Sequence, residues 1–543
     1  MPKPNKLVWF HRIFKLLLLT IITAYTTNNS SVSIQVIGLI HTSNCENESL
    51  LFPSTNSNSN SIPPRTSTVP NMASEFIPKL KIMLRQSIHA LSPSVPFEED
   101  DETALANLIF ESMYTPGRVY HSMQHVFNIT ENCDVVETNP ILVLSVLFHD
   151  VIYYSVDKTF LKSQLELLKG VLAFDENDEE LQQPLTLAPD AQDTPMFDMT
   201  LRIFALEAGK TLPNFGTNEF LSAIIGVRAL SKWLSHSQLT QLAACIEGTV
   251  PFRPASSDGK TAMDRLYDRL VIVSPDQSED WWTETIHLTA TMANCDLGSF
   301  DSFNFDFFLD SSWSLIPEFR PSMLNEDCPL REYYDEFKAM EGRTKFLIMS
   351  VPNIFQAFRN VPSKEEMAAK QDKARSNLKL SDDYAQVRRL EYMVLMEFVT
   401  IVGENPDTLK GRLFLRLVLP ETLPYSEDHD DDVRKLLFRG RRASYSWDPA
   451  TSSLGTFLYD RLGKQGVDAA VDVAKAEPFG NHVLLNHLPK DVVEVIASSL
   501  VDVLPNRSDV LSEISNKLGG CGNEIQLTEK LVIGENVTCA SAD

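Results

Sequence analysis

Histidines and aspartates stand in this sequence where they could hold a metal ion. His121 and His125 are four residues apart, so a helix would place both on one face. His149 and Asp150 close an apolar run that begins at Ile141 and is predicted to be a buried helix. Ionisable groups at the end of a buried helix are unfavourable unless another charge compensates them. A divalent cation would provide that compensation, so the pattern favours a metal site.

Asp296 completes a candidate ligand set. It lies in the apolar helical stretch 288–297, just as His125 and the pair His149 and Asp150 end or interrupt apolar stretches. Two imidazoles and two carboxylates form a mixed nitrogen and oxygen set, which suits Mn, Mg, Fe, Co, Ni or Zn better than an ion that seeks thiolates. Such an ion lowers the pKa of its bound water and makes hydroxide available near neutral pH. The chemistry expected from this set is hydrolysis.

Each of these residues also has a structural interpretation when it is taken alone. A single histidine on a helix is more often a hydrogen-bonded structural residue than a ligand. His149 could make a favourable contact with the dipole at a helix C-terminus, and Asp296 could cap a helix. A second His-Asp pair, His429–Asp430, lies in an acidic run with no apolar helix before it, so we expect a solvated loop there. The joint pattern of the four candidates favours the metal site.

The candidate residues carry a resemblance to a known family. Their order, a histidine, a His-Asp pair and then an aspartate on separate helices, resembles the signature of the HD superfamily of metal-dependent phosphohydrolases. The segment 118–125, Arg-Val-Tyr-His-Ser-Met-Gln-His, is similar to the R-x-Y-H-x-x-x-H motif of small predicted HD phosphohydrolases and to the Y-H-N-x-x-H motif of cyclic-nucleotide phosphodiesterases. The segment 293–297 resembles the helix that carries the last aspartate in both. The resemblance covers residues 75–380, and none is identified for 381–543.

The resemblance implies roles for five residues. His125, His149, Asp150 and Asp296 would be metal ligands, and Asp150 would be needed for catalysis as well as for metal binding. His121 would be the general acid that protonates the leaving oxygen, a role that suits the unperturbed pKa of a histidine. The alternative is that His121 only supports a neighbouring ligand. The implied activity is hydrolysis of a phosphomonoester or phosphodiester, with a nucleotide as the expected substrate.

The sequence departs from the family pattern after the His-Asp pair. Phosphodiesterases place another histidine a few residues later for a second metal ion, whereas the residues at 151–154 here are Val-Ile-Tyr-Tyr. Small HD phosphohydrolases usually continue with acidic and amide residues, of which Asp157 would be a remnant. These departures support an alternative function, a catalytically inactive HD-fold module that binds a nucleotide or regulates a partner.

Three further residues are candidates for substrate binding. Arg118 is a candidate phosphate contact, because a guanidinium matches phosphate geometry. The alternative for Arg118 is an ordinary salt bridge. Glu247 lies within an apolar segment, and together with Arg253 it could line the pocket. The interpretation that we favour for Glu247 is a buried partner of Arg253.

Composition argues against some function classes. The formal net charge of −25 argues against a nucleic-acid polymer as the partner, because such binders present a basic face. The negative net charge does not exclude a small phosphorylated substrate, since the site of such a substrate needs only one local cation or metal ion. The seven cysteines are scattered without C-x-x-C spacing, so neither a zinc finger nor a disulfide framework is predicted. Their odd number favours a reducing compartment, and the sequence identifies no protein partner.

Helical periodicity dominates the chain from Ser74 onwards. No sustained alternation typical of strands is visible, so we expect an all-α fold. The resemblance implies that this fold is of the HD-domain and phosphodiesterase type. An HD-type domain is expected at 72–380 with an acidic insertion at 172–200, and a helical C-terminal region of unknown role at 381–543. The stretch 420–452 is predicted to be a loop. Helices are predicted at 74–90, 99–113, 118–137, 140–150, 158–171, 194–207, 217–235, 237–247, 260–270, 280–296, 330–358, 363–378, 383–402, 455–475, 489–503 and 508–518.

The first 71 residues differ from the rest. Basic residues precede the apolar run 16–22, which is the pattern of a secretory signal over 1–25, and an Asn- and Ser-rich linker that is expected to be disordered follows. The apolar run is too short for a stable membrane span. A functional leader would direct the protein to the secretory pathway, whereas translation from Met72 would leave it cytoplasmic. A secreted glycoprotein with a purely structural helical body is a third interpretation.

Overall fold

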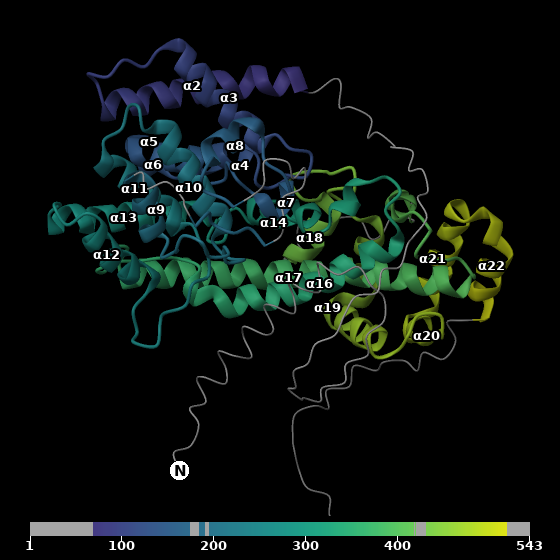
Figure 1. Cartoon of the computed structure of the whole chain (residues 1–543). Coiled ribbons are helices and arrows are strands. Elements are labelled where there is room, and N and C mark those ends of the chain that lie inside the picture. The colour runs from purple at the N-terminus through teal and green to yellow at the C-terminus, as the bar shows by residue number, and fades with distance from the viewer. Residues whose placement is uncertain (1–68, 174–183, 190–194, 418, 420–430, 518–543) are drawn as a thin grey trace, which may run out of the picture. The chain divides into compact units, whose positions relative to one another are not determined.

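The computed structural model of the chain describes residues 69–173, 184–189, 195–417, 419 and 431–517 (Figure 1). All of these residues belong to one compact unit, Arg65–Asp543. The predicted leader, most of its linker, the pair His429–Asp430 and parts of the acidic insertion lie outside the described residues. None of the described helices is long and apolar enough to cross a membrane.

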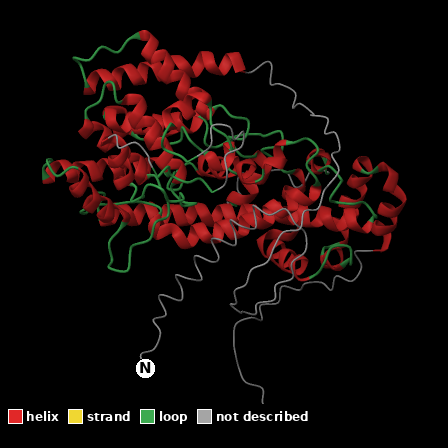
Figure 2. Cartoon of the chain, viewed as in Figure 1, coloured by secondary structure: helices red, strands yellow, loops and turns green. Residues whose placement is uncertain are grey.

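Every regular element of the described residues is helical, which confirms the predicted all-α class (Figure 2). Within the described ranges, extended segments pair only through isolated bridges, such as the one between Leu172 and Leu187. The helices are α2 (Val69–Leu91), α3 (Glu99–Met113), α4 (Met123–Asn132), α5 (Asp134–Thr138), α6 (Pro140–Phe148), α7 (Tyr154–Asp157), α8 (Lys162–Leu168), α9 (Pro195–Ile203), α10 (Thr217–Leu230), α11 (His236–Gly248), α12 (Ala262–Val273), α13 (Glu279–Asp296), α14 (Phe305–Ser314), α15 (Ile316–Phe319), α16 (Leu330–Ser350), α17 (Lys364–Ile401), α18 (Asp432–Arg439), α19 (Ser453–Ala476), α20 (Val483–His487), α21 (Lys490–Val503) and α22 (Ser508–Lys517), with short 3₁₀ turns between some of them.

Helix α6 is the centre of the first hydrophobic core. Helices α2, α4, α5, α10, α11 and α13 all pack against it. A helix that neighbours enclose has no face for polar residues, and α6 is accordingly apolar all round, with Leu144 fully buried. Asn139 caps the start of the helix through its side-chain oxygen, and Pro140 occupies the first turn. The helix ends directly before His149 and Asp150, so its packing fixes where those two side chains lie.

Helix α17 organises a second hydrophobic core. It runs for 38 residues and packs against α16 and α19, and residues such as Leu390 are fully buried (Figure 1). The domain boundary predicted at 380/381 falls inside this continuous helix. Apart from Phe358, the first core ends at Met292, and the second core begins at Leu309. The chain thus passes from one core to the other between α13 and α14.

The helix predicted at 118–137 begins only at Met123. Three successive backbone N–H groups before it, the last of which belongs to His121, donate to Glu318 Oε1 at 2.8, 2.7 and 3.0 Å. These hydrogen bonds hold the preceding segment as a loop. His121 therefore lies on a loop and His125 on a helix, and the two do not share a helix face.

Other helix bounds differ from the predictions locally. The helices predicted at 363–378 and 383–402 are the single helix α17. The stretch 420–452, predicted to be a loop, contains α18. The helix predicted at 158–171 is shortened to α8, and the sequence pattern predicted neither α14 nor α15.

Candidate metal centre

The four predicted ligands meet where three helices end or begin. His125 lies in the first turn of α4, His149 caps the C-terminus of α6, and Asp296 is the last residue of α13. Helices α4 and α13 both pack against α6, and Asp150 directly follows His149. His125, His149 and Asp296 each offer one ligand atom within 4.8 Å of the others, which is a group that could hold a metal ion.

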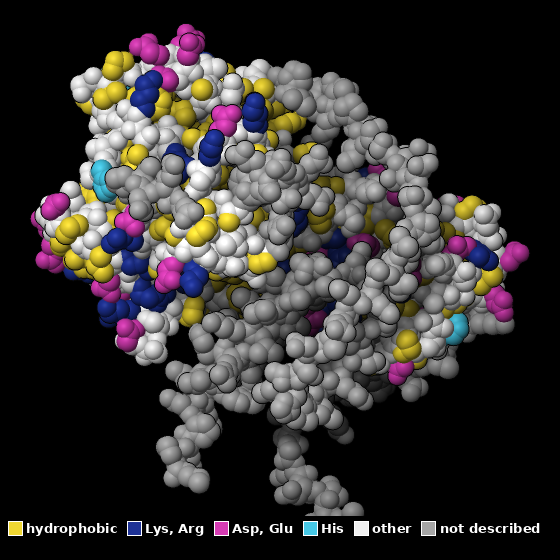
Figure 3. All heavy atoms as spheres, viewed as in Figure 1, with side chains coloured by type: hydrophobic (Ala, Val, Ile, Leu, Met, Phe, Trp, Pro, Cys, Tyr) yellow, Lys and Arg dark blue, Asp and Glu magenta, His cyan; other side chains and the backbone are white. Residues whose placement is uncertain are grey.

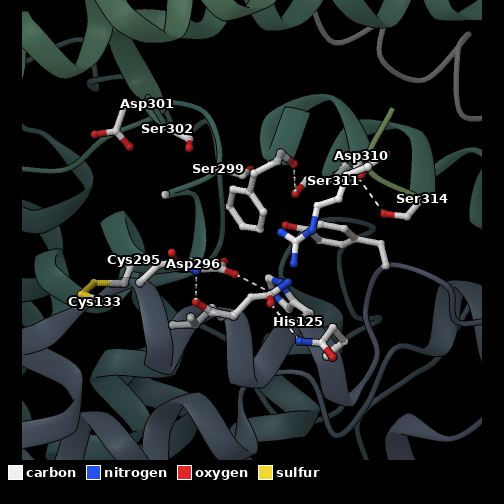
Figure 4. Close-up of a pocket in the computed structure, with 18 of the residues that line it drawn as sticks. His125, Cys133, Cys295, Asp296, Ser299, Asp301, Ser302, Asp310, Ser311 and Ser314 are labelled. Atoms are coloured by element: carbon white, nitrogen blue, oxygen red, sulfur yellow. Dashed lines mark hydrogen bonds and ion pairs between the residues drawn. A yellow bond between two sulfur atoms is a disulfide. The ribbon is translucent and has the colours of Figure 1, made fainter. Parts of the chain in front are cut away.

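Asp150 joins this group through one carboxylate oxygen. Its Oδ2 lies 3.0 Å from His149 Nε2 and 3.7 Å from His125 Nε2. Asp296 Oδ1 lies 3.1 Å from His125 Nε2 and 3.5 Å from His149 Nε2. Figure 4 shows His125 and Asp296 turned toward one another. The structure therefore brings all four predicted ligands into one cluster.

Two buried atoms of this cluster indicate that a cation fits there. His149 Nδ1 lies 2.9 Å from the carbonyl oxygen of Val146, to which it donates, so in the neutral ring the lone pair is on Nε2. His149 Nε2 and Asp150 Oδ2 are buried and make no hydrogen bond with any described residue. Buried polar atoms without hydrogen bonds are rare because they are unfavourable. A divalent ion between these atoms would satisfy both of them.

Protonation of the cluster depends on the balance between imidazoles and carboxylates. Burial opposes the charged ring of His149, but the carboxylates of Asp150 and Asp296 outweigh burial and raise its pKa well above the usual range. Burial likewise opposes the charge of Asp296, but the neighbouring imidazoles of His125 and His149 lower its pKa to about 2. Despite burial, the charge of His149 also lowers the pKa of Asp150. Because the carboxylates stay charged, either protons on the rings or a metal cation must balance them.

His121 lies beside the cluster and is not one of the atoms grouped in it. Its Nδ1 is 2.6 Å from Glu318 Oε2, and its ring stacks on that of Tyr153 with the centroids 3.9 Å apart. The ring centroids of His121 and His125 are 5.9 Å apart. Burial opposes the charged ring of His121, but the carboxylates of Glu318 and Asp150 raise its pKa. Glu318 thus orients the ring and favours its protonated form, and Nε2 is the nitrogen left for proton transfer.

Two acidic residues near the cluster were not foreseen. Glu318 lies in the short helix α15, 197 residues after His121, and no local pattern distinguishes it. Glu219 lies in the first turn of α10, which Asn218 ties to the segment after Asp150 by accepting a hydrogen bond from the backbone N–H of Tyr154 at 2.9 Å. Burial raises the pKa of Glu219 to about 7, and the nearby carboxylates of the cluster act in the same direction.

Glu219 makes the stability of the metal-free protein depend on pH. The folded state keeps a proton on Glu219 up to a pH of about 7, whereas an unfolded chain loses it near about 4.3. The contribution of this carboxyl group is therefore fully present below a pH of about 4.3 and is lost as the pH rises to about 7. We expect Glu219→Gln to leave the free energy of unfolding nearly unchanged at about pH 4 and to increase it by up to about 3 kcal/mol at about pH 8. Urea unfolding of the chelated wild type and variant across this range is the measurement, and a pH-independent difference would contradict the assignment.

Arg118 forms the salt bridge that was the alternative to its predicted role as a phosphate contact. Its side chain is fully buried, and its Nε and Nη2 donate to the carboxylate of Asp157 at 3.0 and 2.5 Å. Its Nη1 donates to the carbonyl oxygen of Asp150 at 2.6 Å. The guanidinium is therefore engaged by the protein itself, and it fixes the backbone that follows the His-Asp pair. Asp157, which was expected to be a remnant of a family motif, is the carboxylate that pairs with this guanidinium.

Removing the buried positive charge of Arg118 should lower the stability of the folded protein. We expect Arg118→Met to lower the free energy of unfolding by about 3–5 kcal/mol, because the largely buried carboxylate of Asp157 would keep only Thr115 as a hydrogen-bond donor and would lose its cationic partner. The matched control is Arg202→Met, which breaks an exposed pair with Asp198 and should cost less than about 1 kcal/mol. Urea unfolding measures both. Unchanged stability together with a raised KM would instead restore the phosphate-contact role.

Glu247 and Arg253 form the ion pair that we favoured for them. Arg253 Nη1 lies 2.5 Å from Glu247 Oε1, and Arg269 Nη2 reaches the same oxygen at 2.5 Å. Glu247 is buried. Neither Glu247 nor Arg253 lines the cavity beside the cluster, so the structure does not bring them to the predicted pocket.

A disulfide that the sequence did not indicate adjoins the cluster. Cys133 at the start of α5 is bonded to Cys295, which directly precedes Asp296 (Figure 4). The bond joins positions 162 residues apart and so ties the end of α13 to the junction of α4 and α5. Disulfides persist mainly in oxidising compartments, which runs against the reducing compartment that the odd cysteine count favoured.

A cavity of about 630 Å³ opens beside the cluster. His125 and Asp296 line one side of it, and Asp310 and Ser311 of α14 line another (Figure 4). The volume lies in the range of sites that hold drug-sized ligands and cofactors. The cluster is therefore not sealed in the core, and a small molecule can reach two of its four residues.

Comparison with known proteins found no matching family model, no matching curated protein and no matching solved structure. The resemblance to the HD superfamily therefore stays a prediction that rests on the motif residues.

Proposed function

We propose that this protein is a metal-dependent phosphohydrolase that acts on a small phosphomonoester or phosphodiester, with a nucleotide as the expected substrate. The observation that carries the proposal is the group of His125, His149 and Asp296 with Asp150 beside it, in which two buried atoms lack hydrogen-bond partners among the described residues. Its position beside a cavity of about 630 Å³ gives a substrate access to it. Two imidazoles with two carboxylates suit Mn, Mg, Fe, Co, Ni or Zn.

Each group of the site has a role in this proposal. The four clustered residues would hold a divalent cation, which when bound polarises a phosphoryl oxygen and lowers the pKa of water. His121, held at Nδ1 by Glu318, donates a proton from Nε2 to the leaving oxygen of the ester. The carboxylates of Glu318 and Asp150 raise its pKa and so favour the protonated form that this step needs.

Charge supports a small substrate over a polymer. The chain carries a formal net charge of −25, and on the described part of the face in Figure 3 Lys and Arg are interspersed with Asp and Glu. Nucleic-acid binders present a continuous basic area instead. A single phosphorylated molecule needs only the local charge of the metal site.

A second candidate is a nucleotide-binding or regulatory module without turnover. It is supported by the segment after the His-Asp pair, in which Tyr153 stacks on His121 and Asp157 is engaged by Arg118. Neither residue is therefore placed to hold a second metal ion. This candidate predicts that metal and nucleotide bind but that no ester is hydrolysed.

A phosphatase screen decides between the two. The full chain is chelated, reconstituted separately with each of the six ions named above, and assayed against nucleotides, sugar phosphates and a chromogenic phosphodiester. Hydrolysis that depends on one of the ions supports the phosphohydrolase. Metal binding without hydrolysis of any ester supports the binding module.

A further inference from the structure

The cavity beside the metal cluster has a wall that comes from the C-terminal region. His125 and Asp296 line it from the first part of the chain, and Arg442 and Tyr445 line it from the loop between α18 and α19. This loop is more than 140 residues beyond Asp296 and belongs to the region for which the sequence predicted no role. The region 381–543 therefore contributes directly to the candidate site.

Arg442 is a cation of this cavity that forms no ion pair with a described residue, although its charge acts on the carboxyl group of Asp310, which lines the same cavity. Its side chain is exposed, and no carboxylate of the described residues lies within ion-pair distance of it. Lys370, which also lines the cavity, is neutralised by Asp301 at 2.6 Å. Among the described lining residues, Arg442 is thus the cation available to a ligand. A guanidinium binds phosphate through two parallel hydrogen bonds and is preferred for that geometry.

Buried contacts hold the loop that carries Arg442. The preceding residue, Arg441, donates from Nη1 to Asp448 Oδ2 at 2.7 Å, and both side chains are fully buried. Arg388 Nη2 and Trp313 Nε1 donate to the same carboxylate at 2.5 and 2.8 Å. This network fixes both ends of the loop against the second core. A residue on a fixed loop loses little conformational freedom when a ligand binds, which favours affinity.

We propose that Arg442 binds the phosphate group of the substrate across the cavity from the metal cluster, so that the C-terminal region completes the active site. The inference rests on the proposed function for the identity of the ligand, a phosphate ester. Arg442 would take the role of phosphate contact that the sequence predicted for Arg118, whose guanidinium is buried and paired with Asp157. The C-terminal region is on this account a part of substrate recognition.

The test measures binding of inorganic phosphate and the KM of the ester found in the screen. Full-length wild type, Arg442→Met, Arg442→Lys and the control Arg461→Met are compared, all reconstituted with the same ion. Arg461 pairs with Asp491 on the exposed surface and does not line the cavity. We expect Arg442→Met to weaken phosphate binding and to raise KM by about 10- to 100-fold, with metal content unchanged. Arg442→Lys should recover part of the loss, and Arg461→Met should behave as the wild type.

The outcomes separate this inference from the proposed function. Phosphate affinity and KM that are unchanged in Arg442→Met would overturn the inference, while hydrolysis by the wild type would still uphold the phosphohydrolase. No phosphate binding by the wild type at millimolar concentration would also overturn it. Phosphate binding that is lost in Arg442→Met, in a protein that hydrolyses no ester, would support the inference and exclude the hydrolase. Because Arg442 is exposed, its replacement should leave the thermal unfolding temperature unchanged, and that measurement checks folding.

Discussion

Replacing Asp150 by alanine is expected to lower the turnover of a phosphate ester by at least about 10³-fold. Asp150 Oδ2 is the buried oxygen between the two imidazole rings, so its removal takes a charged ligand from the metal group. A bound metal stabilises the charge of the transition state by several kcal/mol. Each loss of about 1.4 kcal/mol of this stabilisation lowers the rate tenfold. Initial rates of wild type and variant with the active ion test this directly.

Folding of this variant can be separated from its activity. Asp150 Oδ2 lies 3.0 Å from His149 Nε2, so the variant also loses a buried ion pair of the chelated protein. We therefore expect chelated Asp150→Ala to be less stable than chelated wild type but still folded, and thermal unfolding of both proteins checks this. Asp198→Ala, at an exposed position of α9, is the activity control. Full activity in Asp150→Ala would contradict the assignment of Asp150 to the metal group.

Replacing His121 by alanine should lower kcat by about 10²- to 10⁴-fold while the protein keeps its metal. His121 is held by Glu318 and lies beside the ligand rings without joining their group. A general acid contributes to the rate in this range, whereas a ligand would take the metal with it. Measured kcat and metal content of the same preparation distinguish the two roles, and loss of metal would make His121 a ligand.

The carboxylate of Glu318 provides a second test of the general acid through the pH profile. A proton donor must be protonated, so activity falls as the pH rises through the pKa of His121. The charge of Glu318 raises that pKa, and Glu318→Gln removes the charge but keeps a hydrogen-bonding side chain. The alkaline limb of kcat/KM should therefore move to lower pH in Glu318→Gln. An alkaline limb at the same pH would exclude His121 as the donor.

The ligand cluster was predictable because its signal is local. The apolar run before His149 has the composition of a helix that is buried on all sides, and the structure encloses α6 in that way. A charged pair at the end of such a helix needs a partner wherever the helix lies. The same logic applies to Asp296 at the end of α13. The all-α class followed from periodicity in the same local manner.

Residues that act through distant contacts carried no such signal. Glu318 contacts His121, which lies 197 positions earlier in the sequence. Its carboxylate keeps the segment before α4 in a loop, although the pattern of that segment is typical of a helix. The buried pair of Arg118 with Asp157 depends on the turn after the His-Asp pair, and an arginine in a motif does not show which anion it meets. The disulfide between Cys133 and Cys295 likewise joins residues that sequence spacing does not relate.

The two helices predicted on either side of position 380 are one helix for a related reason. Helix α17 changes from a largely exposed first half to a second half in which residues such as Leu390 and Tyr392 are buried. A change of amphipathic pattern along one helix resembles a junction between two helices. Only the packing of α17 against α16 and α19 shows that the helix continues through this change of pattern.

Metal content of the purified full-length protein tests the central claim most directly. Wild type, Asp150→Ala and Asp198→Ala are expressed in the same medium, reconstituted, freed of loosely bound ions and analysed by inductively coupled plasma mass spectrometry. The account predicts about one equivalent of a divalent metal in the wild type and in Asp198→Ala, and almost none in Asp150→Ala. Wild type without metal after reconstitution, or metal retained in full by Asp150→Ala, would contradict it.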